Sequence, residues 1–269
     1  MANLTDILPY LAGVKVIKET YTDTTAPFNF VKDPEDKFYL VKIWSGGGGG
    51  ATNYDTNNRQ YGGAGGAYFE TFIIASELAD TTACVVGAGG PPGTGGSPTA
   101  GGNTSFGDFT VTGGQLNGGS FIDFPEQRIL ENNGSFLVAS FVLDGIYSGG
   151  RVASLINDQS VYSGKSFYGG GAGGFSVRRT TDGSIRVSNG GNSIYGGGGG
   201  GTTTNFGSPI FTPAATNGGI SKFAGNGGNA SIGGPGENGS FPSGGGAAGY
   251  LGFTGGSGAN GQIIVYRFR

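Results

Sequence analysis

Glycine at every third position is the feature that most constrains this chain. From Gly246 to Gly261 the sequence reads G-A-A-G-Y-L-G-F-T-G-G-S-G-A-N-G. A period of three is neither helical nor strand-like, but it matches polyproline II, which has three residues per turn. Such a helix has no internal hydrogen bonds, so its backbone groups need partners in neighbouring segments. We therefore expect one continuous run of roughly 45 Å, at 3.1 Å per residue, that lies against similar runs.

Strand patterns adjoin several of the glycine runs. Alternating or continuous β-branched and aromatic residues are typical of strands. They occur at Lys37–Trp44, Ala67–Ala75, Thr81–Val86 and Gln262–Arg269. The first leads into Ser45–Gly50 and the third into Gly87–Gly96, so a strand that meets a glycine run is an internal motif. It is not a repeat of fixed length.

A disordered glycine-rich linker is the alternative to a packed bundle. The chain has 61 Gly and 11 Pro among 269 residues, which is the composition of low-complexity segments. Disordered chains, however, are poor in aromatic and rich in charged residues, whereas here each class makes up 12%. Collagen is excluded as well, because the period of three is patchy and proline is scarce. The composition therefore favours an ordered fold.

Other patterns predict local structure between the glycine runs. Ser135–Leu143 is nearly continuous in apolar residues and predicts a strand buried on both faces, while Arg151–Gln159 predicts one or two helical turns. Phe175–Ser188 predicts a hairpin that turns at Asp182-Gly183. Asn-Gly pairs predict tight turns, since both residues tolerate positive φ. Their asparagines are at 117, 133, 189, 217, 226, 238 and 260.

These patterns together predict a mostly β fold with little α-helix, in which β-strands feed a bundle of polyglycine-II helices. We expect an N-terminal docking segment, residues 1–27, followed by a glycine-rich β/polyglycine-II domain, residues 28–269. A less glycine-rich insert lies near 117–165. The N-terminus lacks the basic start and apolar core of a signal peptide, so we expect synthesis in a cytosol.

The sequence argues against catalysis and against cofactors. There is no histidine, which removes the commonest general base and metal ligand, and Cys84 has no second cysteine with which to pair. No phosphate-loop or dinucleotide motif is present. Asp55 with Asn57, or Asp158 with Asn157, could ligate calcium, but their spacing matches no known loop. The carboxylate pair Asp123 and Glu126 lacks a distinguishing context. We expect no enzyme, no cofactor and no metal.

The glycine motifs, taken in order, resemble the glycine-rich domain of bacteriophage tail-fibre and related virion proteins. The long runs are similar to the polyglycine-II sandwich of small phage tail-fibre adhesins. The resemblance covers about Phe28 to Arg269. It rests on W-S-G-G-G-G-G-A (44–51), Y-G-G-A-G-G-A-Y-F (61–69), V-V-G-A-G-G-P-P-G-T-G-G (85–96), N-T-S-F-G (103–107), Y-G-G-G-A-G-G (168–174) and G-A-N-G-Q-I-I-V-Y (258–266).

This resemblance implies a virion protein, made in the host cytoplasm, that binds a host surface receptor through loops between glycine runs. The implied partners are other tail, fibre or baseplate proteins and a saccharide or outer-membrane protein as receptor. Both a homotrimer and a monomer capping a trimeric fibre fit the resemblance. A net charge of −3 gives no indication of a nucleic-acid partner.

Aromatic and polar loop residues are the receptor-binding candidates, because aromatic stacking and amide hydrogen bonding suit recognition by a rigid scaffold. They are Tyr54, Asn57, Phe206, Phe211 and Phe241. Burial of these rings at the ends of the bundle is the alternative. Two other functions remain open at this point: a structural virion component without a receptor, such as a capsid decoration or baseplate part, and an ice-binding protein.

Overall fold

The computed structural model describes residues 14–52, 59–114, 122–123, 152–154, 161–163, 165–178, 185–204 and 214–269. This part of the chain is mostly β and contains no α-helix; a 3₁₀ turn, η2, spans Ala75–Glu77. None of its helical segments is long and apolar enough to cross a membrane. The strands are β1 Val16–Tyr21, β2 Phe28–Val31, β3 Phe38–Trp44, β4 Arg59–Tyr61, β5 Tyr68–Ile74, β6 Thr81–Val85, β7 Thr104–Phe106, β8 Phe109–Val111, β9 Ile122–Asp123, β10 Val152–Ser154, β11 Val161–Ser163, β12 Phe175–Arg178, β13 Ile185–Ser188, β14 Thr203–Thr204, β15 Ala214–Ala215 and β16 Gln262–Phe268.

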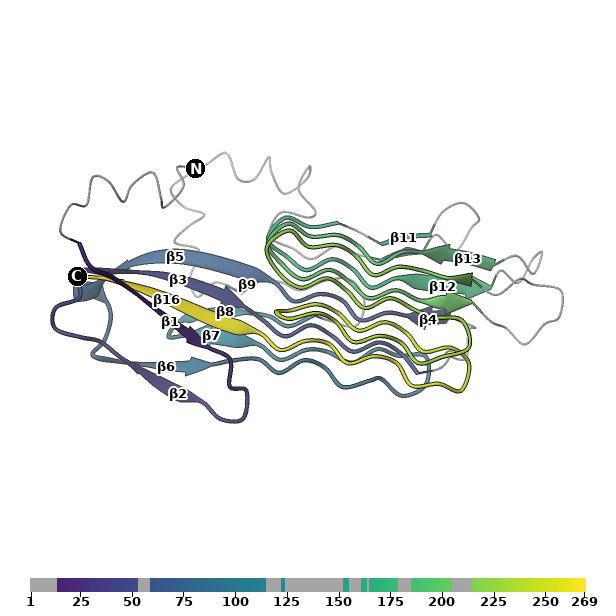
Figure 1. The fold of residues 1–269 in the computed structure, drawn as a ribbon, viewed down its shortest axis with the longest axis horizontal. Coiled ribbons are helices and arrows are strands. Elements are labelled where there is room, and N and C mark those ends of the chain that lie inside the picture. Colours follow the sequence, from purple (N-terminus) through teal and green to yellow (C-terminus); the bar gives the residue numbers. More distant parts are fainter. Residues whose placement is uncertain are drawn as a thin grey trace.

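Two antiparallel sheets form one end of the molecule (Figure 1). A four-stranded sheet has the order β1-β16-β3-β5, and a five-stranded sheet has the order β2-β6-β7-β8-β9. Their facing side chains alternate along each strand and build the main apolar core. Phe30 and Phe106 of the second sheet meet Tyr39 of the first, with the Phe30 and Tyr39 rings 5.4 Å apart. The strands predicted at Lys37–Trp44, Ala67–Ala75, Thr81–Val86 and Gln262–Arg269 are confirmed as β3, β5, β6 and β16.

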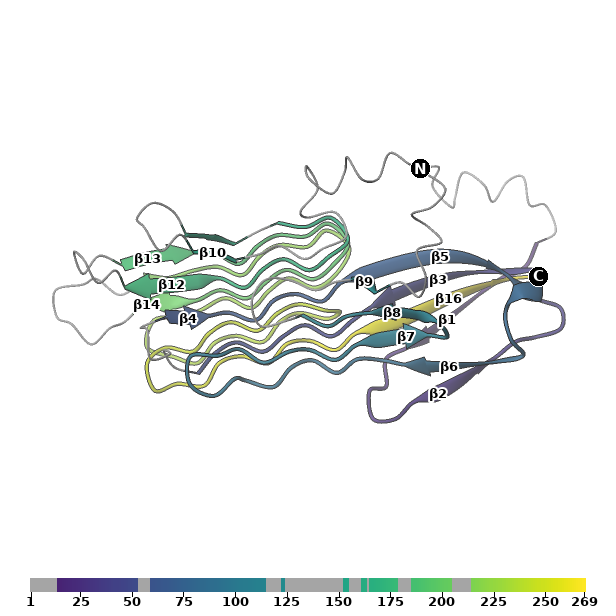
Figure 2. The same ribbon diagram turned by 180° about the vertical axis from the view of Figure 1, so that it is seen from behind.

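Glycine-rich segments extend from the ends of these strands to the far end of the molecule (Figures 1 and 2). They run side by side and carry no strand ladder over most of their length. We call them the glycine bundle. The bundle comprises residues 45–51, 61–67, 86–93, 98–103, 112–114, 168–174, 188–202, 216–230, 235–249 and 254–261.

The innermost segment, 46–51, bonds to its neighbours in rotation. Successive amides donate to segment 98–103, then to 254–261, then to 61–67, and the order then repeats. The donor and acceptor pairs are Gly46–Gly102, Gly47–Ala259, Gly48–Ala64, Gly49–Thr99, Gly50–Gly256 and Ala51–Tyr61, at N···O distances of 2.8 to 3.0 Å. Backbone groups thus supply the cohesion that side chains supply in an ordinary core.

Close backbone approach explains why glycine occupies these positions. A Cβ atom built on Gly49 would overlap the carbonyl oxygen of Pro91, and one built on Gly50 would overlap that of Ala247. Both obstacles are main-chain atoms, which cannot move aside as a flexible side chain can. Gly46 to Gly50 are all buried, so any side chain larger than hydrogen at these positions would separate the segment from its neighbours.

The expectation of one continuous run from Gly246 to Gly261 is wrong. The chain reverses at Tyr250–Phe253, where the Phe253 amide donates to the Tyr250 carbonyl at 2.7 Å and Gly252 adopts φ +79°. The two halves then lie beside each other, and the amide of Gly256 donates to the carbonyl of Ala247 at 2.8 Å. The glycine at 252 serves the turn, because only glycine enters this φ region without strain.

The Asn-Gly pairs that fall within the described residues do not form turns. None of their asparagines has positive φ, and four of these side chains accept a backbone N–H from another part of the chain. These bonds are Asn189 with Asn217 N, Asn226 with Ser221 N, Asn238 with Ser257 N and Asn260 with Gly89 N, at 2.8 to 3.2 Å. In these four residues the carboxamide oxygen links two stretches of backbone instead of stabilising a tight turn. The pairs beginning at Asn117 and Asn133 lie outside the described residues.

A column of aromatic rings joins the bundle to the four-stranded sheet. Tyr68 of β5 stacks on Tyr195 at 5.3 Å, and Tyr195 stacks on Tyr168 at 5.0 Å and on Phe223 at 4.8 Å. Trp44 donates through Nε1 to the Tyr195 carbonyl at 3.0 Å. The column therefore fixes the bundle against the end of the sheet.

A short repeat produces that column. Ser166, Ser193 and Ser221 pair in parallel, and each is followed two residues later by an aromatic ring of the column. The Ser193 hydroxyl accepts the Gly196 amide and donates to the Gly169 carbonyl at 2.7 Å. Ser221 likewise accepts the amide of the residue three positions on and donates to the preceding repeat. Each serine thus closes its own turn and ties it to its neighbour.

The region after residue 115 is described only in parts. Val152–Ser154 pairs with Val161–Ser163 as an antiparallel ladder, so the helical turns predicted for Arg151–Gln159 are wrong at 152–154, where cross-strand bonds satisfy the backbone. The predicted hairpin is confirmed as β12 paired with β13, while its turn lies outside the described residues. So do Ser135–Leu143 and most of the insert near 117–165. Within the predicted docking segment, β1 belongs to the four-stranded sheet, and residues 1–13 lie outside the described part.

Candidate functional site

Several chain reversals gather at the end of the glycine bundle remote from the sheets, which we call the turn end (Figure 1). The turn at 231–234 lies beside the turn at 250–253, because the Tyr250 amide donates to the Gly234 carbonyl at 3.0 Å. Thr52 donates through its hydroxyl to the Gly93 carbonyl and accepts the Gly255 amide, which brings two more segments to the same place. The turn end is therefore one continuous surface built from segments distant in sequence.

A buried polar cluster holds the turn end together. Gln60 is completely buried in β4 and donates through Nε2 to the Gly249 carbonyl at 2.6 Å. Its Oε1 atom accepts the Thr203 hydroxyl at 2.9 Å. Thr203 and Thr202 are buried as well. These bonds give the surface turns a rigid base, which suits recognition rather than movement.

The turns expose apolar side chains. Ile232 lies in one turn, and Leu251 and Phe253 lie in the other; all three are exposed, with Ile232 at 55%. Gly233 adopts φ +75° in the first turn, as Gly252 does in the second. The turn end thus exposes three large apolar side chains from two neighbouring turns.

Phe241 is the one predicted site residue that the structure describes. Tyr54 and Asn57, as well as Phe206 and Phe211, lie outside the described residues. Their described flanking residues, Thr52 and Thr204 among them, lie at the turn end. Phe241 is 51% exposed, but it lies at the opposite end of the bundle.

The location of Phe241 follows from its neighbours in the chain. Ser243 donates through its hydroxyl to the carbonyl of Ser45, the residue directly after β3. The Gly66 amide donates to the Ser243 carbonyl at 2.8 Å, two residues before β5 begins. The turn that carries Phe241 therefore faces the sheets, and this ring is not part of the turn end.

An ion-pair network at the sheet end is structural in its geometry. Arg267 Nη1 donates to Asp36 at 2.9 Å, Tyr39 donates its hydroxyl to the same carboxylate at 2.7 Å, and Arg269 Nε donates to its other oxygen at 2.8 Å. Burial disfavours ionisation of Asp36, but the hydrogen bonds from Tyr39, Arg269 and Arg267 outweigh it and hold the pKa below its ordinary value. The Asp36 side chain has no exposed surface, so no substrate can reach this carboxylate.

Cys84 and the carboxylates of the described residues do not form a metal-binding cluster. Burial raises the pKa of the Cys84 thiol to about 11, which keeps it protonated at neutral pH. In the described ranges no three acidic, cysteine or histidine side chains lie close enough together to hold a metal ion.

Sequence reasoning missed Ile232, Leu251 and Phe253. The glycine spacing predicts that Leu251 and Phe253 belong to one continuous period-three run. The hydrophobic sequence Y-L-G-F at 250–253 interrupts that run, however, and a glycine within such a sequence is typical of a turn. It also missed the repeat of serine followed by an aromatic two residues later, for which the signal was the near-equal spacing of Ser166, Ser193 and Ser221. No family model matches this chain, and a search of curated proteins gave no match either.

Proposed function

We propose that the glycine bundle consists of polyglycine-II helices that saturate one another's backbone groups. The support is the rotation of the donors from Gly46 to Ala51 among three neighbouring segments, because three residues per turn return every third amide to the same side. Hydrogen exchange tests the assignment: these amides should exchange only on global unfolding. Exchange at the rate of an open coil would overturn it.

We propose further that the protein is a non-catalytic phage virion protein, at a tail or fibre tip, that binds a host surface receptor. The observation that carries this proposal is the turn end, where turns from distant segments present exposed side chains on a rigid base. The sheet end would face other virion proteins, and the turn end would meet a saccharide or an outer-membrane protein. Lack of histidine and burial of Cys84 support a role without chemistry.

The sheet end offers a surface for attachment. Phe72 and Ile74 of the edge strand β5 are exposed, with Phe72 at 61%. Phe72 pairs with Leu40 and Ile74 pairs with Phe38 on β3, so their side chains lie on one face of the sheet. An exposed apolar row on an edge strand is typical of a protein contact.

Adsorption of virus particles to their host tests the receptor role. Particles would carry Ile232→Ser, Leu251→Ser and Phe253→Ser together, and a second set would carry Tyr54→Ala, Asn57→Ala, Phe206→Ala and Phe211→Ala. Phe241→Ala forms a separate arm. The matched control is Val31→Ser, which removes a comparably exposed apolar side chain from β2, on the sheet that does not carry Phe72 and Ile74.

We expect both the turn-end set and the set of predicted loop residues to lower adsorption at least tenfold while particles assemble normally. Val31→Ser should leave adsorption per assembled particle unchanged. Undiminished adsorption in both sets would overturn the receptor role. Excess free protein should also block infection, whereas a purely structural virion component would leave infection unaffected.

A further inference from the structure

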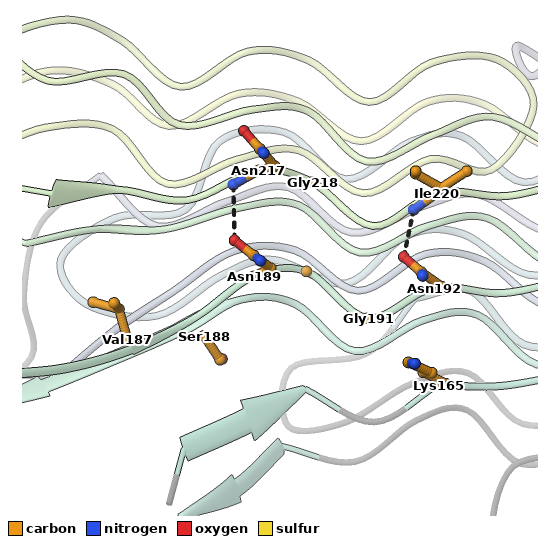
Figure 3. Close-up of a pocket in the computed structure, with 10 residues that line it drawn as sticks. Lys165, Val187, Ser188, Asn189, Gly191, Asn192, Asn217, Gly218 and Ile220 are labelled. Carbon is orange, nitrogen blue, oxygen red and sulfur yellow. Dashed lines mark hydrogen bonds between the residues drawn. The ribbon is translucent and has the colours of Figure 1, made fainter.

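A groove runs along the side of the glycine bundle, apart from the turn end (Figure 3). Its volume is about 570 Å³, within the roughly 300–1,000 Å³ of small-molecule sites. Three adjacent segments line it, and they contribute Lys165, then Asn189 and Asn192, then Asn217 and Ile220. The Ser166 amide donates to the Asn192 carbonyl at 2.9 Å, which places Lys165 beside that residue.

Two asparagines in the groove are oriented by the backbone they bind. Asn189 accepts the Asn217 amide at 3.2 Å, and Asn192 accepts the Ile220 amide at 2.8 Å (Figure 3). A backbone N–H can only donate, so the atom that receives it must be the carboxamide oxygen Oδ1. The remaining atom of each exposed side chain is the Nδ2 group. Asn189 and Asn192 therefore present hydrogen-bond donors to the groove.

The charged side chain of the groove also favours a ligand with acceptor atoms. Lys165 is exposed and adds an ammonium group that also only donates. Among the described residues that line the groove there is no aspartate or glutamate, and none of the described carboxylates pairs with Lys165. Val187 and Ile220 supply apolar edges. A groove with donors, one cation and apolar edges selects a ligand rich in acceptor oxygens that also has C–H faces.

We propose that this groove binds an oligosaccharide bearing carboxylate or phosphate groups. One acidic group would lie at Lys165 and the Nδ2 group of Asn192, and a second at the Nδ2 group of Asn189, since charge-assisted hydrogen bonds are the stronger ones. Sugar rings would lie against Val187 and Ile220. The inference stands apart from the receptor role of the turn end, because none of the groove residues belongs to either turn.

Calorimetric titration of the full chain tests the proposal with three probes: tri-galacturonate, the neutral trisaccharide maltotriose and inorganic phosphate. The groove variants are Asn189→Asp with Asn192→Asp, and Lys165→Gln. Aspartate keeps an oxygen for the Asn217 and Ile220 amides and removes the Nδ2 donor. The matched control is Asn226→Asp, because Asn226 accepts the Ser221 amide at 2.9 Å in the same manner but does not line the groove.

We expect tri-galacturonate to bind the native chain, and maltotriose and phosphate to bind at least tenfold more weakly. The double aspartate variant should lose at least tenfold in affinity, Lys165→Gln severalfold, and Asn226→Asp should match the native chain. Absence of tri-galacturonate binding would overturn the proposal, as would equal affinity for maltotriose. Equal affinity for phosphate would reduce the groove to an anion site and overturn the saccharide assignment. If Asn226→Asp weakened the binding of tri-galacturonate as much, the effect would come from net charge, and the assignment of the binding site to the groove would be overturned.

Discussion

The Nε2 atom of Gln60 donates to the carbonyl oxygen of Gly249 at 2.6 Å, in the buried base of the turn end. These residues belong to different glycine-rich segments, and the bond fixes where one segment ends relative to the other. Because glycine has no side chain, a polar side chain such as that of Gln60 is needed to make a specific contact between two segments here. The turn end should therefore be sensitive to changes at Gln60.

Replacing Gln60 by leucine should destabilise the protein by about 1–3 kcal/mol, because it leaves the Gly249 carbonyl and the Thr203 hydroxyl buried without this partner. Denaturant unfolding followed by the fluorescence of Trp44, the one tryptophan, measures the loss. Thr203→Val and the double variant complete a double-mutant cycle. Strict additivity of the two losses would show that Gln60 and Thr203 do not act together.

Alanine in place of Gly49 or Gly50 should cost more than about 3 kcal/mol, since the new methyl group would overlap main-chain oxygen and the bundle cannot shift locally. Gly234→Ala is the control, because the nearest atom to its Cβ is the hydroxyl of Ser231, on a flexible side chain. Thermal unfolding of the three variants compares them directly. Tolerance of alanine at Gly49 would argue against close backbone packing.

Stability should fall in acid because of Asp36. Its pKa is lowered on folding, so its contribution is complete above the ordinary value of about 3.9 and is lost as pH falls through the folded pKa. The free energy of unfolding of the native chain should therefore drop below about pH 4. Asp36→Asn should be less stable at pH 7, where Arg267 loses a charged partner, and should show a shallower acid dependence. Glu77→Gln, which changes an exposed carboxylate, should retain the native pH profile.

The Cys84 thiol should not react with a disulfide reagent at pH 8 in the folded protein. It is fully buried and its pKa is raised to about 11, so both access and thiolate content are low. Labelling should become rapid in denaturant and should follow the unfolding curve seen by Trp44 fluorescence. Fast labelling without denaturant would reveal local opening of the core between the two sheets.

Strands and glycine runs were predictable from the sequence because each leaves a local signal. Phe38–Trp44 and Gln262–Phe268 are dense in β-branched and aromatic residues, and period-three glycine marks segments that need close neighbours. The partners of those segments were not predictable. Gly50 bonds to Gly256, and nothing in either local sequence identifies the other.

Turns were harder to predict because one residue type serves two purposes. Gly252 and Gly249 differ only in the backbone angle that the fold imposes, so their spacing suggested one run. Asparagine before glycine usually means a turn, but Asn189 and Asn260 accept amides across the bundle instead. Of the predicted site residues, Phe241 was placed with the others on loop composition alone, whereas its neighbour Ser243 anchors it beside Ser45.

Segment 46–51 bonds to residues that lie far from it in the sequence, and this separation has a consequence for synthesis. Gly47 and Gly50 are synthesised long before Ala259 and Gly256, whose carbonyl groups accept their amides. Closing a loop this long costs conformational entropy before the stabilising contacts between its ends can form, which makes folding slow. The amides at the centre of the bundle must therefore stay hydrogen-bonded to water until residues 254–261 have been synthesised.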